Sequence, residues 1–148
     1  MTSTDSIRVP FETLAAFVAS AFEALGMAAA DAQRVGHLMA EADLQGSDGH
    51  GVIRLAPYVQ RIRAGGMNVR ADIRVLQERA GTALLDGGNA MGHLVMSRAA
   101  EMAMAKARNC GIGWVGARMS NHAGPASLYA RMPLAAGMVG LYFAVGNA

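Results

Sequence analysis

The sequence predicts an α/β protein in which an N-terminal helical layer precedes the alternating strands and helices of an incomplete mixed sheet, not a Rossmann fold. Two observations predict this class. Apolar residues recur at helical spacing through the first third, and short β-type runs alternate with helical segments after it. We therefore divide the chain into a helical N-terminal region, residues 1–70, and a partial α/β domain, residues 71–148. The length of 148 residues suits about one domain.

Three helices are expected in the first region. Pro10 suits the first position of a helix, and apolar residues follow at helical spacing until Gly26 stops it. A second helix is expected over Ala29–Leu44. A third is expected over about His50–Arg63, with Pro57 marking a kink or an early end.

Strand and helix patterns alternate after the break at Gly65-Gly66. The elements predicted there, in chain order, are a strand over Ile73–Gln77, a strand over Thr82–Leu85, a helix over Met91–Asn109, a strand over Ile112–Ala117 and a helix over Pro125–Ala136. The long central helix is strongly supported by its length and its Ala, Met and Leu content. The eleven methionines are interpreted as core filler.

The C-terminal segment carries no charge from Met132 to Ala148. A membrane helix is disfavoured, because the run is shorter than the usual ~20 residues and is broken by proline and glycine. A buried strand over Val139–Val145 fits better, since buried parallel strands are continuous apolar runs. Such a strand needs covering elements on both faces, so we expect the α/β domain to be truncated at its C-terminal end.

Composition excludes several classes of protein. The formal net charge is +2 and no run of like charge concentrates a field, so neither nucleic acid nor a membrane is expected as a partner. The single cysteine, Cys110, excludes an intrachain disulfide framework and a cysteine-rich zinc site. No pair of histidines has zinc-type spacing, and we expect no metal. The N-terminal residues form no apolar leader, so a cytoplasmic location is expected.

Two glycine-rich segments are candidate phosphate-binding motifs. Gly111–Gly116 matches G-x-G-x-x-G, but that motif needs a strand before it and a helix opening within it. Here a helix precedes it and its own residues are strand-like, so we interpret it as a chance match. Asp86–Gly92 has a better context but the wrong glycine spacing. It is interpreted as a tight turn with Asn89 near a helix cap, and a phosphate cradle is the alternative.

The most informative feature is His122, which lies in the turn Ser120–Ala126 between a predicted strand and a predicted helix. Side chains in such a turn project from a strand end beside the free N–H groups of a helix start, where open α/β sheets build active sites. Histidine can also give and take a proton at neutral pH. His122 is therefore a candidate catalytic residue.

A second candidate group precedes the Gly65-Gly66 break. His50, Arg54 and Tyr58 are spaced to lie roughly along one helix face. Arginine offers a planar fork to a carboxylate, and tyrosine offers a hydroxyl to orient it. The alternative, which spacing alone favours, is a solvated helix face. His37 and His93 are interpreted as structural histidines with satisfied hydrogen bonds.

These residues belong to segments that resemble the signature of the malate/L-lactate dehydrogenase family. Its members are NAD(P)-dependent oxidoreductases with a non-Rossmann fold, and they include ureidoglycolate, sulfolactate and diketogulonate enzymes. The resemblance covers nearly the whole chain, and the segments that carry it, in the family's order, are Asp43–Tyr58, Arg63–Asn68, Asp86–Gly92, Gly113–Gly116 and Ser120–Ala126. The segments around His50 and His122 are specific to the family.

The resemblance implies reversible hydride transfer between NADH or NADPH and a 2-oxo acid, which gives a 2-hydroxy acid such as malate or lactate. It implies that His50 and His122 face the substrate, that Arg54 holds the substrate carboxylate and that Tyr58 lines the pocket. One of the two histidines would supply the proton. We favour His122 because it lies at a strand end, with His50 as its competitor.

The residues expected to bind the cofactor are fewer than those expected to bind the substrate. By resemblance, Gly146 and Asn147 would reach only the edge of the NAD or NADP site, and the full-length form is expected to be a homo-oligomer, a dimer. Three features depart from the family. Gly49 stands where the family usually has serine, and Ala123 stands where phenylalanine is common, so the smaller side chain would loosen the pocket beside His122. The family also runs to roughly twice this length. We therefore expect an N-terminal portion of such an enzyme, weakly stable or inactive alone. The alternative is a non-catalytic truncated paralogue that binds a partner subunit through an exposed apolar edge.

Overall fold

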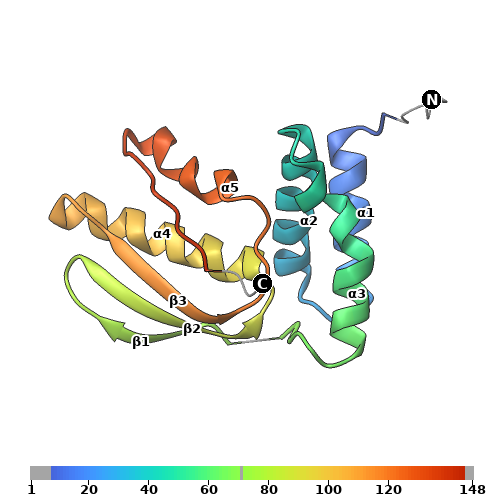
Figure 1. The fold of residues 1–148 in the computed structure, drawn as a ribbon, viewed down its shortest axis with the longest axis horizontal. Helices are drawn as coiled ribbons and strands as arrows, with labels where there is room; N and C mark the ends of the chain where they lie inside the picture. The colour runs from blue at the N-terminus through green and yellow to red at the C-terminus, as the bar shows by residue number, and fades with distance from the viewer. Residues whose placement is uncertain (1–7, 71, 146–148) are drawn as a thin grey trace.

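The computed structural model describes residues 8–70 and 72–145. Its elements, in chain order, are α1 (Phe11–Glu23), α2 (Ala29–Leu44), the 3-10 turns η1 (Asp48–His50) and η2 (Val52–Arg54), α3 (Leu55–Arg63), β1 (Arg74–Glu78), β2 (Thr82–Ala90), α4 (Gly92–Cys110), β3 (Trp114–Ser120), α5 (Ser127–Ala130) and η3 (Met132–Ala136). Helices α1–α3 stand side by side at one end of a three-stranded sheet, and α4 covers one face of that sheet (Figure 1). The predicted class, mixed α/β with a helical N-terminal layer, is confirmed. No helix in the described ranges is both long and apolar enough to cross a membrane.

Helices α1 and α2 form the centre of the helical layer. Phe22 and Met39 are fully buried in their shared core. The helices approach closely at Gly36, where a Cβ atom would lie 2.4 Å from the carbonyl oxygen of Ala15. Only glycine permits this spacing, so α2 is held tightly against α1.

The third helix differs from its prediction at the N-terminal end. Gly51, with ψ −139°, interrupts the helical path between η1 and η2, and α3 begins only at Leu55. Pro57 therefore falls in the first turn of α3, where backbone N–H groups have no intrahelical acceptor. Its missing N–H costs no hydrogen bond, so the expected kink or early end at Pro57 was wrong. The helix ends at Arg63 as predicted.

The sheet is mixed, with the strand order β1-β2-β3. Strands β1 and β2 pair antiparallel, and β2 and β3 pair parallel through the crossover helix α4. Strand β2 runs on to Ala90, so the tight turn predicted over Asp86–Gly92 was wrong. Gly88 and Asn89 instead have φ values of 56° and 62° in an irregular stretch where the pairing with β3 shifts register. Asn89 lies near the helix cap as expected, two residues before Met91, which holds the N-cap position of α4 without a side-chain capping bond.

The G-x-G-x-x-G segment has a packing function. Gly111 ends α4 in the left-handed conformation, with φ 77°. At Gly113 a Cβ atom would lie 1.9 Å from the carbonyl oxygen of Ala103, so glycine lets the chain turn back closely over α4. Its last three residues, 114–116, belong to β3 and no helix opens within the segment, as predicted.

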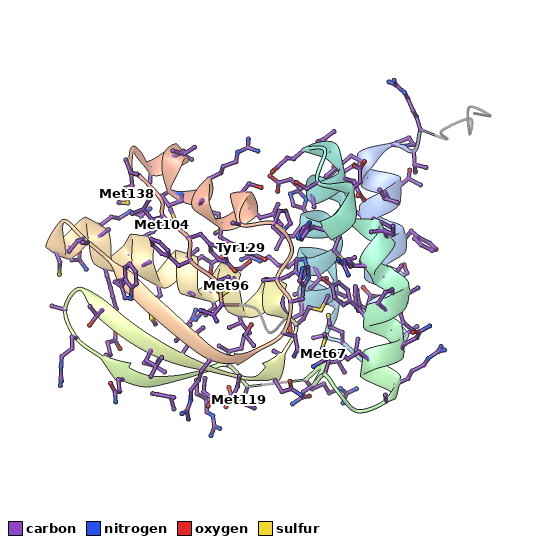
Figure 2. All side chains as sticks on the ribbon, viewed as in Figure 1. Met67, Met96, Met104, Met119, Tyr129 and Met138 are labelled. Atoms are coloured by element: carbon purple, nitrogen blue, oxygen red, sulfur yellow. The ribbon has the colours of Figure 1, made fainter. Side chains whose placement is uncertain are left out.

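Methionine contributes to the core, as predicted, but not uniformly. Met39, Met67 and Met91 are buried in the core cluster of the helical layer, whereas Met119 is 58% exposed. A second cluster lies between α4 and α5, where Figure 2 shows Met96 and Tyr129.

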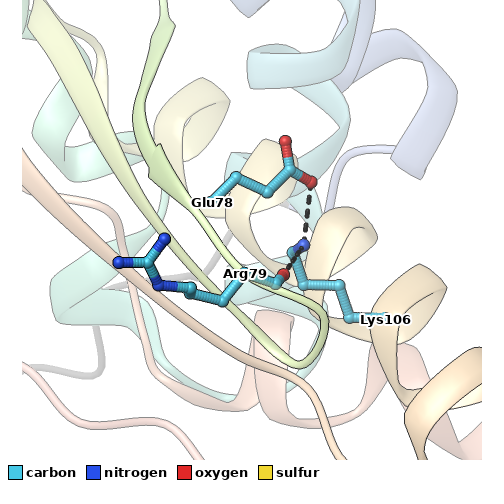
Figure 3. Close-up of polar contacts among 3 residues, drawn as sticks. All are labelled: Glu78, Arg79 and Lys106. Carbon is cyan, nitrogen blue, oxygen red and sulfur yellow. Dashed lines mark hydrogen bonds and ion pairs between the residues drawn. The ribbon is translucent and has the colours of Figure 1, made fainter.

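The single lysine of the chain joins α4 to the turn between β1 and β2 (Figure 3). Lys106 Nζ donates to Glu78 Oε1 at 2.8 Å and to the carbonyl oxygen of Arg79 at 2.7 Å. The Lys106 side chain is buried, so both bonds satisfy an ammonium group that burial would otherwise destabilise. This contact fixes the end of the sheet that lies away from the helical layer.

The C-terminal part corrects two predictions. The helix expected over Pro125–Ala136 forms only as the short α5 and η3, because Pro133 removes a backbone donor inside that run. The strand expected over Val139–Val145 is absent, since residues 139–145 pair with no described strand.

Residues 139–145 nevertheless run extended along the surface. Val139, Leu141 and Phe143 are 88%, 77% and 69% exposed, whereas the Tyr142 ring stacks on Tyr129 at 5.4 Å. Apolar composition predicts burial only where neighbouring elements cover the segment, and among the described residues few do. The predicted cofactor contacts Gly146 and Asn147 lie outside the described residues.

Candidate active site

Three aromatic side chains meet where the helical layer adjoins the end of β3. The His50 and His122 rings stack with their centroids 5.4 Å apart and their planes at 23°. The Tyr58 hydroxyl lies 2.5 Å from His122 Nδ1. Arg54 is close enough for its charge to lower the pKa of His122. The structure therefore brings together His50, Arg54, Tyr58 and His122, the four described residues that the sequence marked as candidates.

His50, Arg54 and Tyr58 do not lie along one helix face, as the spacing had suggested. His50 lies in η1, Arg54 is the N-cap of α3, and only Tyr58 lies within α3. Arg54 Nε donates to the carbonyl oxygen of Gly49 at 2.7 Å, which bends the guanidinium back toward η1. Its terminal nitrogens make no hydrogen bond or ion pair within the described ranges. They are therefore free to bind an anion.

Asp43 supports this segment, a role that the sequence reasoning missed. Its Oδ2 accepts the backbone N–H of Val52 at 2.9 Å. At Gly51 a Cβ atom would lie 1.8 Å from Asp43 Oδ1, so the carboxylate packs directly against the glycine backbone. The sequence offered one sign of this contact, the glycine at position 51 directly after His50, where a close approach of another group excludes a side chain.

Replacing Gly51 with alanine is expected to destabilise the chain by roughly 1–3 kcal/mol, because the new Cβ must displace the Asp43 carboxylate and break its bond to Val52. Urea denaturation followed by circular dichroism measures this loss. Gly49→Ala is the matched control, since a Cβ at Gly49 meets nothing within 4 Å. Equal unfolding midpoints for the two variants would contradict the expectation.

The protonation of His122 follows from its neighbours. The backbone N–H of Gly124 donates to His122 Nδ1 at 3.3 Å, so Nδ1 is an acceptor and the neutral ring carries its own proton on Nε2. Burial raises the pKa of Tyr58 to about 12, so its hydroxyl keeps its proton at pH 7. With Nδ1 unprotonated, the Tyr58 hydroxyl is the donor in the Tyr58–His122 contact. Partial burial, His50 and Arg54 all lower the pKa of His122, which keeps the ring neutral at pH 7.

His93 is a further histidine next to this site. It is fully buried, and its ring meets Tyr58 edge to face at a centroid distance of 6.0 Å. Neither ring nitrogen has a hydrogen-bond partner among the described residues, so the expectation of a satisfied structural histidine was wrong. Burial, with a smaller contribution from His122, lowers the pKa of His93 to about 3.

The two departures from the family pattern have different surroundings. Gly49 is exposed and has open space where a side chain would project. Ala123 is 8% exposed and packs in the cluster of Leu128 and Tyr129, with its carbonyl oxygen accepting the Tyr129 hydroxyl. Ala123 therefore contributes to the core between α4 and α5.

Neither glycine-rich segment has the form of a pyrophosphate cradle. The glycines that could cradle a pyrophosphate are used elsewhere: Gly113 packs against α4, and the Gly88 N–H donates to Asp86 Oδ1 at 2.8 Å. Within the described ranges no cluster of three or more His, Cys, Asp or Glu side chains could hold a metal ion. The site as described offers two imidazoles, a guanidinium and a phenol, which suit a carboxylate and a carbonyl oxygen.

The fold and this site together define a non-Rossmann α/β protein with paired imidazoles and a guanidinium where the helical layer meets the end of the sheet. The sequence profile that matches residues 9–148 is described as malate/L-lactate dehydrogenase. The chain belongs to this family, which confirms the resemblance read from its sequence.

Relatives with known names agree with this membership. The chain is 42% identical over 135 residues to malate dehydrogenase from Pyrococcus horikoshii, covering 91% of this chain and 38% of that protein. It is 41% identical over 104 residues to L-sulfolactate dehydrogenase from Methanothermobacter thermautotrophicus, covering 70% of this chain and 30% of that protein. The solved structure of the Pyrococcus horikoshii enzyme matches with a TM-score of 0.88 and 40% identity, over 93% of this chain and 40% of that one. The chain thus spans well under half the length of these relatives.

Proposed function

We propose that this chain provides the substrate-binding side of an oxidoreductase that interconverts a 2-oxo acid and a 2-hydroxy acid, such as malate or lactate. The observation that carries the proposal is the group formed by His50, Tyr58 and His122 beside Arg54, whose terminal nitrogens have no partner among the described residues. Relatives named malate and sulfolactate dehydrogenase support the same reaction class, because both names denote 2-hydroxy acids.

Arg54 binds the substrate carboxylate in this proposal. Its Nε is already bonded to Gly49, which leaves the two terminal nitrogens to form a forked pair of hydrogen bonds with a carboxylate. Holding the carboxylate at this point would place the adjacent carbonyl group of a 2-oxo acid near the imidazoles.

His122 moves the proton. Its Nε2–H donates to the substrate oxygen as negative charge develops there, and the Tyr58 hydroxyl passes its own proton to Nδ1 at the same time. Tyr58 is left as a phenolate near the positive charge of Arg54, and solvent returns its proton after the reaction. The ring thus changes tautomer and never becomes an imidazolate. The high pKa of Tyr58 keeps its proton in place until the substrate oxygen becomes a stronger base. His50, stacked on His122, remains the competing proton donor.

A nicotinamide cofactor, NAD or NADP, would supply the hydride, and the described residues contain no set that would hold it. The proposal extends to a cytoplasmic enzyme that acts as a dimer in its full-length form. A second candidate function is the binding of a partner subunit without catalysis. The exposed side chains of Val139, Leu141 and Phe143, with Trp114 at 57% exposure, favour it.

Titration of the chain with pyruvate and with oxaloacetate tests the substrate site, with the His50 and His122 resonances followed by NMR. We expect saturable shifts of both, and Arg54→Met is expected to weaken binding by about tenfold or more, because a charge-assisted forked contact is lost. Arg63→Met is the matched control, since Arg63 is exposed at the far end of α3. If neither acid shifts the two histidines, the substrate-site proposal is wrong. Oxidation of NADH or NADPH in the same samples tests turnover.

A further inference from the structure

The proposed site is assembled from two segments that are distant in the chain. Arg54 and Tyr58 belong to the helical layer, whereas His122 follows β3. The short Tyr58–His122 contact requires α3 and the loop after β3 to be held at a fixed separation. Hydrogen bonds between side chains of α3, β2 and the loop after β3 hold these two segments together.

Four hydrogen bonds close a ring across this junction. Arg61 Nε donates to Asn121 Oδ1 at 3.1 Å and to the carbonyl oxygen of Gly66 at 3.2 Å. Asn121 Nδ2 donates to Asn89 Oδ1 at 3.0 Å, and Asn89 Nδ2 donates to the Gly66 carbonyl oxygen at 3.2 Å. The ring therefore joins α3 and the turn after it to the end of β2 and the loop after β3.

Asn121 is the most connected member of this ring. Besides Asn89 Oδ1, its Nδ2 lies 2.9 Å from each of the carbonyl oxygens of Asn89 and Ala90. Its own backbone N–H donates to the Ala90 carbonyl oxygen at 3.3 Å. Both ends of the side-chain amide are thus used, one toward α3 and one toward β2.

The ring lies next to the reacting groups in sequence as well as in space. Asn121 directly precedes His122, so any displacement of its backbone moves the imidazole. Arg61 follows Tyr58 by three residues, which places both on the same side of α3. Asn89 accepts and donates from a left-handed backbone conformation, φ 62°, that its short amide side chain tolerates.

We propose that Asn121 is a positioning residue that holds His122 Nδ1 against the Tyr58 hydroxyl by locking the loop after β3 to α3 and to the end of β2. Its importance for catalysis rests on the proposed function, but its effect on the His122 ring does not. Loss of the Asn121 amide would loosen the loop from α3, and His122 Nδ1 would lose the Tyr58 hydroxyl and keep only the Gly124 N–H as a donor.

The test uses the whole 148-residue chain labelled with 15N in its histidines, and long-range 1H–15N spectra that report which ring nitrogen of His122 carries the proton. The wild type is expected to show the Nε2–H form. Asn121→Ala is expected to change the ratio of the two tautomers by at least about threefold, the consequence of losing roughly one hydrogen bond of constraint. Asn68→Ala is the matched control, because the exposed Asn68 amide caps only the backbone N–H of Arg70.

Arg61→Met breaks the same ring of hydrogen bonds, and Arg61 is exposed, so this variant is expected to fold. It therefore tests the proposal even if Asn121→Ala does not fold. It is expected to shift the His122 tautomers in the same direction. If folded Asn121→Ala and Arg61→Met proteins give wild-type His122 spectra and only a lower unfolding midpoint, Asn121 is merely structural and the proposal is overturned. Failure of the wild type to bind pyruvate would instead overturn the proposed function, and leave the tautomer result standing.

Discussion

Replacing Gly92 with alanine is expected to destabilise the chain by about 3 kcal/mol or more, the upper range for overpacking against atoms that cannot move aside. Gly92 is the first residue of α4, and a Cβ there would lie 2.1 Å from the carbonyl oxygen of Asn121 and 2.5 Å from that of His122. Both are backbone atoms of the loop that carries the proposed proton donor. The substitution therefore combines a loss of folding free energy with a displacement of His122.

Urea denaturation at neutral pH measures the first effect, and the His122 resonances of the folded fraction report the second. A loss of this size is a large fraction of the ~5–15 kcal/mol that separates folded from unfolded domains, so partial unfolding in buffer is expected. Gly49→Ala serves again as the control with open space at the new Cβ. A Gly92→Ala protein with the stability of that control would show that the loop does not pack on α4 as described.

Acidification is expected to destabilise the chain through His93. The pKa of His93 is lowered to about 3 in the folded state, against the ordinary histidine value of 6.5 in the unfolded chain. Between these values the unfolded state binds a proton that the folded state does not, so stability falls as the pH falls. The slope is about 1.4 kcal/mol per pH unit, which amounts to roughly 4 kcal/mol between pH 6.5 and pH 3.5. Below pH 3 both states are protonated at His93 and this contribution stops changing.

The free energy of unfolding measured from pH 7 to pH 4, in wild type and His93→Leu, isolates this effect. The difference between the two curves removes contributions shared by both proteins, such as the lowered pKa of Asp86. Leucine also removes two buried nitrogens that have no partner in the described structure, so His93→Leu is expected to match or exceed wild-type stability at pH 7. Parallel curves for the two proteins would contradict the prediction. NMR titration of His93 in the wild type gives an independent answer, since its ring is expected to stay neutral at pH 5.

Much of the secondary structure could be predicted because it depends on local pattern. The second helix was predicted over Ala29–Leu44 and forms over those residues, and the long helix predicted over Met91–Asn109 forms as α4. Apolar spacing and a glycine at each C-terminal end carry this information within one segment. The same reasoning placed the G-x-G-x-x-G segment after a helix and at the start of a strand, where the structure has it.

Predictions that depended on neighbouring elements were less accurate. The uncharged Val139–Val145 run was expected to be a buried strand, yet residues 139–145 pair with no described strand and Phe143 is 69% exposed. An apolar run is buried only if other elements cover it, and the composition of the run does not say which elements lie beside it. Gly88 and Asn89 were expected to turn the chain, and they instead bend a strand that continues, because β3 supplies pairing partners on both sides of the irregularity.

The sequence by itself determined the α/β class, the family, and the identity of His50, Arg54, Tyr58 and His122 as candidates, since residue types and short spacings carry all of these. Only the tertiary structure decided how they act together. It joined the Tyr58 hydroxyl to His122 Nδ1 across 64 positions of chain, and it placed Asn121 in a ring of hydrogen bonds with α3 and β2. It also buried His93 with no hydrogen-bond partner among the described residues. The physical reason is that hydrogen bonds and desolvation act over a few ångströms in space, whereas the groups they join here lie tens of residues apart in the chain.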